Sequence, residues 1–203
     1  MKLYFAPGAC SFAPHIALVE AALPADLVKV DLRSHTLDDG TDFHSINAKG
    51  SVPVLELDDG SRLTEAAVIL QYIADQRPGT LAPPLGTFER YRLMEWLNFI
   101  ATEVHRGFAP LWDPGTIAEV RQQAIVALGK RFTHLADALE KRTFIAGDAF
   151  SIADAYLTTV LHWTRFHQID LAPWPALIAY QQRMRERPSI QAARRAEAAL
   201  ANG

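Results

Sequence analysis

The stretch MKLYFAPGACSFAPH contains Cys10, the single cysteine of the chain. Cys10 follows an apolar run typical of a strand and a turn of small residues, and a helical pattern begins after it. A sulfur at a helix N-terminus faces unpaired N–H groups and partial positive charge, which stabilise a thiolate and lower its pKa. Free cysteines are also common apolar core residues. The local sequence therefore leaves a reactive thiol and a buried filler both open.

Two neighbouring features could support chemistry at this thiol. The hydroxyl of Ser11 could donate to a nearby sulfur or cap the helix. Val52 precedes Pro53 in GSVPVLEL, and only an X–Pro bond has a reasonable chance of being cis. A cis bond would turn the N–H and C=O of Val52 outward to pair with an extended peptide. The alternative is a trans proline that opens an edge strand.

The segment LTEAA predicts a helix N-terminus with Thr64 as its N-cap. The N–H of Ala66 and the carboxylate of Glu65 could bind the carboxylate and the ammonium of an amino acid. An acidic residue in a first helical turn is also favourable without any ligand.

A polar stripe follows the helix predicted over residues 88–108. Asn98 and His105, two turns apart, share it with Tyr91, Glu95 and Thr102. Such a stripe is commonly the solvated face, but an imidazole that titrates near neutrality could hold a thiolate or shuttle a proton. The other six histidines show no metal-ligand spacing, so the sequence predicts no metal site.

The elements that must position these residues form two groups. The first has the order β-α-β-α-β-β-α, with a hairpin turn expected at Asp59-Gly60. Its predicted elements are a strand at 2–5, a helix at 11–22, a strand at 26–32, helical turns within 42–50, two strands within 52–64 and a helix at 64–76.

Beyond a linker rich in proline and glycine, only helical spacing remains. Helices are predicted at 88–108, 117–142, 153–168 and 175–200. Ser151-x-x-Asp154 is a capping-box pattern with a structural role. The predicted domains are therefore residues 1–77, a linker at 78–87, and an all-helical domain at 88–203.

The composition is that of an ordinary soluble globule, with 49% hydrophobic residues and a net charge of −3 over 203 residues. Charge is dispersed, so neither nucleic acid nor a membrane surface is an expected partner. One cysteine forms no intrachain disulfide. The apolar run at the N-terminus is too short for a signal peptide. A reducing cytoplasm is the expected compartment.

Four segments together closely resemble the beta class of bacterial glutathione S-transferases, in colinear order along essentially the whole chain. They are MKLYFAPGACSFAPHIAL, NAKGSVPVLELDDGSRLTEAAVILQYIAD, ERYRLMEWLNFIATEVHRGFAPLW and FSIADAYL. The resemblance implies an α/β thioredoxin-like N-terminal domain and an all-α C-terminal domain, the glutathione S-transferase fold. It also implies a homodimer, to which the surface around Phe88 and Tyr91 could contribute. Glutathione is then the cosubstrate, bound in the cleft between the domains, and no prosthetic group is expected.

The resemblance also assigns site residues. It makes Cys10 the cysteine beside the glutathione sulfur, able to form a mixed disulfide, with Ser11 and His105 assisting. Val52, with a cis Pro53, would pair with the cysteinyl part of glutathione. The remaining glutathione contacts fall on His35, Glu65, Ala66, Asn98 and, toward the partner subunit's glutathione, Glu103. The second-substrate pocket falls on Phe108, Leu111, Trp112, Trp163 and Phe166, of which the resemblance itself places Trp163.

Two positions depart from the pattern of the class. His35 replaces a lysine thought to reach the glycine carboxylate of glutathione, so binding is expected to tighten in mild acid, where the imidazole is protonated. Ala66 replaces glycine or serine, which keeps the N–H and removes a hydroxyl donor.

Two chemistries fit this constellation. Either the thiolate of glutathione attacks a small hydrophobic electrophile, or Cys10 passes through a mixed disulfide in thiol–disulfide exchange. Conjugation ranks first, with some exchange expected. The alternative function is a non-catalytic protein that binds glutathione or hydrophobic ligands on the same fold. The sequence does not identify the electrophile, and the physiological role stays open among detoxification, aromatic catabolism, dehalogenation and redox repair.

Overall fold

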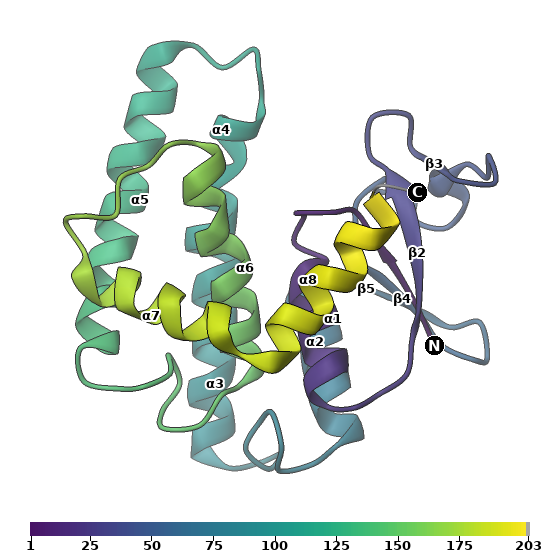
Figure 1. The fold of residues 1–203 in the computed structure, drawn as a ribbon, viewed down its shortest axis with the longest axis horizontal. Coiled ribbons are helices and arrows are strands. Elements are labelled where there is room, and N and C mark those ends of the chain that lie inside the picture. The colour runs from purple at the N-terminus through teal and green to yellow at the C-terminus, as the bar shows by residue number, and fades with distance from the viewer. Residues whose placement is uncertain (202–203) are drawn as a thin grey trace. The chain divides into compact units, whose positions relative to one another are not determined.

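The computed structural model describes residues 1–201, and the chain divides into two compact units (Figure 1). The first unit comprises Met1–Ala82 together with the chain from Arg187 onward, and the second comprises Pro83–Glu186. No helix in the described part of the chain has both the length and the apolar character needed to cross a lipid bilayer.

A mixed five-stranded sheet with the strand order β3-β2-β1-β4-β5 organises the first unit. The strands are β1 (Lys2–Phe5), β2 (Asp26–Asp31), β3 (Thr36–Leu37), β4 (Val54–Glu56) and β5 (Arg62–Thr64). β1 and β2 are parallel, and the other three pairs are antiparallel. The predicted order of elements is confirmed, and β3 is an addition. Two residues are too few to show alternation in a sequence.

The helices of the first unit are α1 (Phe12–Glu20), the 3₁₀ turn η1 (Phe43–Ser45), α2 (Ala66–Gln76) and α8 (Pro188–Ala201). α1 packs against both α2 and α8 (Figure 1). The predicted hairpin between β4 and β5 is confirmed. Asp59 Oδ1 accepts from the N–H of Ser61 at 2.8 Å, and Gly60 has a φ of +83°, which favours glycine.

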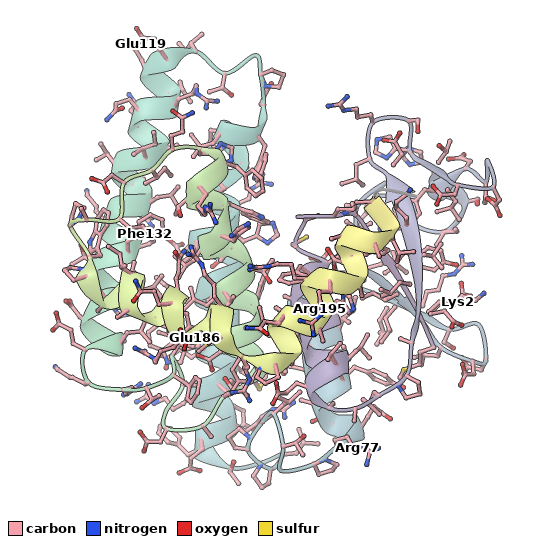
Figure 2. All side chains as sticks on the ribbon, viewed as in Figure 1. Lys2, Arg77, Glu119, Phe132, Glu186 and Arg195 are labelled. Carbon is pink, nitrogen blue, oxygen red and sulfur yellow. The ribbon has the colours of Figure 1, made fainter. Side chains whose placement is uncertain are left out.

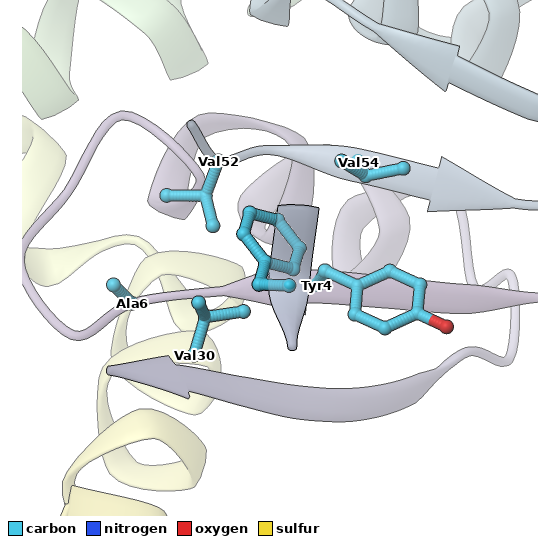
Figure 3. Packing of buried hydrophobic residues seen from close by; sticks show 6 residues of the cluster. Tyr4, Ala6, Val30, Val52 and Val54 are labelled. Atoms are coloured by element: carbon cyan, nitrogen blue, oxygen red, sulfur yellow. The ribbon is translucent and has the colours of Figure 1, made fainter. Parts of the chain in front are cut away.

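One face of the sheet packs into a cluster that reaches the predicted site. Its buried members are Tyr4, Ala6, Val30, Phe43, Val52 and Val54. Figure 3 shows Ala6, Val30 and Val52 gathered at one end of this cluster, with Tyr4 and Val54 farther along the strands. Since the side chain of Val52 is anchored here, its backbone groups have a fixed position.

α8 joins the first unit through polar contacts as well as packing. His15 on α1 and Glu197 on α8 are both buried, with Nδ1 and Oε1 3.0 Å apart. Arg187 forms a bidentate ion pair with Glu20 at the end of α1.

The prediction of one helix over residues 175–200 is wrong, because the structure has two helices there, α7 (Pro175–Glu186) and α8. The chain breaks at Arg187 because a residue before proline, here Pro188, is disfavoured in helical conformation.

The second unit is helical throughout its described elements. They are α3 (Phe88–Phe99), the π-helical segment η2 (Ile100–His105), the 3₁₀ turn η3 (Arg106–Phe108), α4 (Ala109–Trp112), α5 (Ala118–Leu139), α6 (Ile152–Phe166) and α7 (Pro175–Glu186). Phe132 of α5 points into this unit and is fully buried, whereas Glu119 near the beginning of the same helix is exposed (Figure 2).

The capping box at the beginning of α6 is confirmed and lies at the centre of a buried network. Asp154 accepts hydrogen bonds from the N–H groups of Ile145 and Ser151, from the Ser151 hydroxyl and from the Tyr180 hydroxyl. Burial raises the pKa of the Asp154 carboxyl, although these four donors oppose the shift. The network joins α6 to α7 and to the loop before α6.

Replacing Asp154 with alanine should lower the free energy of unfolding by about 2–4 kcal/mol, because four buried donors lose their acceptor. Urea denaturation followed by circular dichroism measures the loss. Asp137→Ala on the exposed face of α5 is the control and should cost less than about 0.5 kcal/mol. Equal stabilities for the two variants would contradict the structural role of the network.

Candidate active site

Cys10 lies in the turn between β1 and α1, and its Sγ donates a hydrogen bond to the carbonyl oxygen of Val52 at 3.2 Å. The peptide bond between Val52 and Pro53 is cis, as the resemblance implied. Two segments 42 residues apart in sequence therefore meet at the sulfur.

Of the two alternatives that the sequence left open for Cys10, the structure favours the buried thiol. Burial is the largest influence and raises the pKa of the thiol to about 12. The backbone N–H groups of Cys10 and Ser11 act in the opposite direction, and the negative charge of Glu65 adds to the increase. The helix N-terminus is thus present, but desolvation of a thiolate outweighs it. Cys10 is a neutral thiol at pH 7.

Ser11 is fully buried and connects the two sides of the same turn. Its Oγ accepts from the N–H of Ala6 at 3.2 Å and donates to the carbonyl of Ala6 at 3.3 Å. It forms no side-chain cap on α1, so the capping alternative is wrong. With its proton directed to Ala6, the hydroxyl fixes the turn that presents Cys10.

Glu65 precedes α2 with a backbone φ of +70°, a conformation that non-glycine residues rarely adopt. It is the N-cap residue, so the prediction of Thr64 in that position is wrong. Lys49 bonds to both residues: its Nζ lies 2.5 Å from Glu65 Oε1 and 2.9 Å from Thr64 Oγ1. Ala66 is the first residue of α2, where backbone N–H groups have no intrahelical acceptor. The exposed carboxylate of Glu65 therefore lies next to the N-terminus of α2.

His35 lies beside Gly50, close in sequence to Val52. Its ring and that of His44 have centroids 4.6 Å apart, and a Cβ built on Gly50 would come within 2.6 Å of the His44 ring and 3.1 Å of His35. His35 has a φ of +53°, and within residues 1–201 its buried Nδ1 has no hydrogen-bond partner. The two imidazoles thus enclose the backbone that leads to the cis peptide bond.

The second unit carries the other predicted residues. His105 ends the π-helical segment, and its Nδ1 lies 2.6 Å from the Tyr156 hydroxyl. π-helical winding turns successive residues by less than a regular helix does, so the stripe predicted for Asn98 and His105 is displaced. Asn98 is exposed on α3. Glu103 accepts two N–H bonds from Arg131 of α5, at 3.0 and 2.7 Å.

The aromatic residues predicted for the second-substrate pocket do lie together within this unit. Trp163 is buried and contacts the rings of Phe108 and Trp112, each at a centroid distance of 5.5 Å, and that of His105 at 4.9 Å. Phe166 packs on Trp112 at 6.2 Å. Leu111 is buried next to Trp112 in α4. We call Phe108, Trp112, Trp163 and Phe166 the aromatic cluster.

Sequence reasoning missed four residues that contact predicted site residues of their own unit: Lys49 and His44 in the first unit, and Tyr156 and His167 in the second. Lys49 directly precedes the motif GSVPVLEL, but no spacing indicated that it pairs with Glu65. His167 lies one residue beyond α6 and contacts the aromatic cluster, with Trp112 at 4.3 Å and Phe108 at 5.8 Å. The helix pattern predicted there gave no reason to select it.

Comparison with known proteins agrees with this geometry. The family model "Glutathione S-transferase, N-terminal domain" matches residues 8–76, and "Glutathione S-transferase, C-terminal domain" matches residues 99–188. Glutathione S-transferase GstA of Escherichia coli O157:H7 is 45% identical over 198 residues, which cover 97% of this chain and 98% of that protein. The chain belongs to the glutathione S-transferase family.

Solved structures of family members agree along the whole chain. A sphingomonad glutathione S-transferase complexed with glutathione has a TM-score of 0.94 and 45% identity, covering 98% of this chain and 99% of that one. A beta class glutathione S-transferase of Sphingomonas chungbukensis has a TM-score of 0.94 and 46% identity, covering 97% and 98%. The predicted fold, transferase class and cosubstrate, glutathione, are thereby confirmed. The roles of individual residues stay predictions.

The thiol of Cys10 should not ionise between about pH 5 and 9, because its pKa is raised to about 12. The ultraviolet absorbance of a thiolate, recorded as the difference between wild type and Cys10→Ala, measures this directly, since the chain has one cysteine. A titration step near neutral pH would contradict the burial argument.

Proposed function

We propose that the protein joins the thiolate of glutathione to small hydrophobic, mainly aromatic electrophiles. In this mechanism Cys10 assists as a protonated thiol, and glutathione is the nucleophile. The observation that supports the assignment of roles is the Cys10 thiol itself, neutral at pH 7 and donating to the Val52 carbonyl.

A neutral S–H group is a poor nucleophile but a hydrogen-bond donor. With glutathione bound through the backbone of Val52, the S–H of Cys10 would lie close enough to donate to the glutathione sulfur instead of the carbonyl. That bond would stabilise the glutathione thiolate without any charge change at Cys10. Ser11 would act by fixing the turn, since its own hydroxyl is engaged with Ala6.

The γ-glutamyl end of glutathione has complementary groups in the first unit. Its carboxylate would be held by the N–H of Ala66 at the beginning of α2, where partial positive charge favours anions. Its ammonium would pair with the carboxylate of Glu65, which is 68% exposed and already holds a cation, Lys49. Contacts of glutathione with His35, Asn98, Glu103 and His105 remain predictions.

Thiol–disulfide exchange is the second candidate. In that reaction the Cys10 thiolate attacks oxidised glutathione, a Cys10–glutathione disulfide forms, and one glutathione thiolate leaves. The raised pKa leaves few thiolates at neutral pH, so we expect this reaction to be slow beside conjugation. The carrier alternative would show glutathione binding without turnover.

A homodimer and a cytoplasmic location also remain proposals. The dimer is supported by side chains exposed in the single chain: Leu85 at 70%, Phe88 at 66% and Tyr91 at 59%. Exposed apolar surface that forms one contiguous patch is typical of a site that a partner covers.

Replacing Cys10 with alanine should keep conjugation of a chlorodinitrobenzene-type electrophile within about ten-fold of wild type, since one neutral hydrogen bond is lost. Initial rates at saturating glutathione measure this. Intact-protein mass spectrometry after incubation with oxidised glutathione should show a slow adduct on wild type and none on the variant.

If conjugation instead falls by a thousand-fold or more, Cys10 carries the reaction and the proposed role is wrong. Binding of glutathione with no turnover of any electrophile or disulfide by wild type would favour the carrier alternative.

Replacing Glu65 with glutamine should weaken glutathione binding by about ten-fold or more, because a charge-assisted bond to the ammonium is lost. Titration calorimetry with reduced glutathione measures the change. Lys49→Met separates a ligand role from a structural one, because it also breaks the ion pair with Glu65. We expect a smaller loss for Lys49→Met, and equal losses would contradict the ligand role of Glu65.

A further inference from the structure

His167 was not assigned to any site by the sequence motifs or by the family resemblance. It follows α6 directly, and its Nε2 is buried with no hydrogen-bond partner among residues 1–201. Buried polar nitrogens are rarely left without a partner in folded proteins, and such an atom in a native chain calls for an explanation.

The surroundings of His167 are the aromatic cluster. Its ring packs edge-on against Trp112, with centroids 4.3 Å apart, and tilted against Phe108 at 5.8 Å. Trp112 in turn contacts Trp163 and Phe166. His167 is therefore a hydrogen-bonding group set among rings that otherwise offer only apolar contact and the indole N–H groups.

Arg121 of α5 supplies a positive charge near this imidazole. One of its guanidinium nitrogens donates to the carbonyl of Leu111 at 3.0 Å, which fixes the side chain next to α4. Burial, and after it the charge of Arg121, lowers the pKa of His167, so the ring is neutral at pH 7. A neutral imidazole keeps one N–H donor and can place it on either nitrogen.

The positive charge decides which kind of ligand atom fits. A donor beside a guanidinium favours oxygen atoms that carry partial or full negative charge. The rings around it favour an aromatic body. Both features together describe an aromatic compound that carries a nitro, carbonyl or carboxylate oxygen.

We propose that His167 is a specificity-determining residue for the second substrate, with its Nε2–H donating to an oxygen substituent on an aromatic electrophile. The inference rests on the proposed function, since it takes the aromatic cluster as the electrophile site. Because Nε2 is buried, the substrate must displace a covering side chain. Trp112 is the candidate, since its indole is 49% exposed and packs at the shortest ring distance from His167.

The test compares two conjugates that differ in one oxygen-bearing group, S-benzylglutathione and S-(4-nitrobenzyl)glutathione. Calorimetric binding of stable conjugates avoids the difference in chemical reactivity between the parent electrophiles. Wild type should prefer the nitro conjugate, and His167→Phe should reduce that preference by about five- to ten-fold, the effect of one hydrogen bond. His167→Gln, which retains an N–H donor, should keep most of the preference.

His134→Phe is the matched control, because His134 of α5 also packs on aromatic rings, those of Trp96 and Phe99, but is exposed. It should leave the preference unchanged. An unchanged preference in His167→Phe, with both conjugates still bound, overturns the inference alone. Failure of wild type to bind either conjugate would overturn the proposed function and this inference with it.

Discussion

The hydrogen bond from Cys10 Sγ to the carbonyl of Val52 is the contact on which the candidate site depends. It joins the turn after β1 to the cis peptide bond before β4, and both segments are anchored in the core of the first unit. Ser11 fixes the turn through its two hydrogen bonds to the backbone of Ala6. Burial of the sulfur keeps Cys10 protonated at pH 7, and its S–H group donates to the carbonyl of Val52.

The negative charge of Glu65 acts on the Cys10 end of this bond. Glu65 is held before α2 in a rarely adopted backbone conformation, and its charge further disfavours a thiolate at Cys10. The same charge would attract the ammonium of glutathione. One carboxylate can thus contribute to cosubstrate binding and to keeping the cysteine protonated.

The main feature of the second unit is a cluster of aromatic side chains, partly exposed, that is carried by a buried helical core. α6 is buried along most of its length and is fixed at its beginning by Asp154. Near its other end, buried Trp163 packs edge-on against the half-exposed Trp112, and His167 follows the helix. The buried helix α6 therefore supplies the buried ring of Trp163, while the exposed rings of the cluster come from the end of α6 and from the short helix α4.

The sequence by itself determined the family, the order of elements in the first unit and the capping box of α6. All three can be recognised from local patterns, namely turn residues, helical spacing and the order of motifs, because these patterns do not depend on contacts between distant residues. It also marked Cys10, Val52 and Glu65 as a group through the resemblance.

Only the tertiary structure decided the protonation of Cys10, the pairing of Lys49 with Glu65, the contacts of His167 and the attachment of α8 to α1. Each of these joins residues far apart along the chain or depends on how far water is excluded. The helix N-terminus near Cys10 favours a lowered pKa, but burial is the larger influence and raises it. Desolvation is a property of the packed chain, which no local pattern contains.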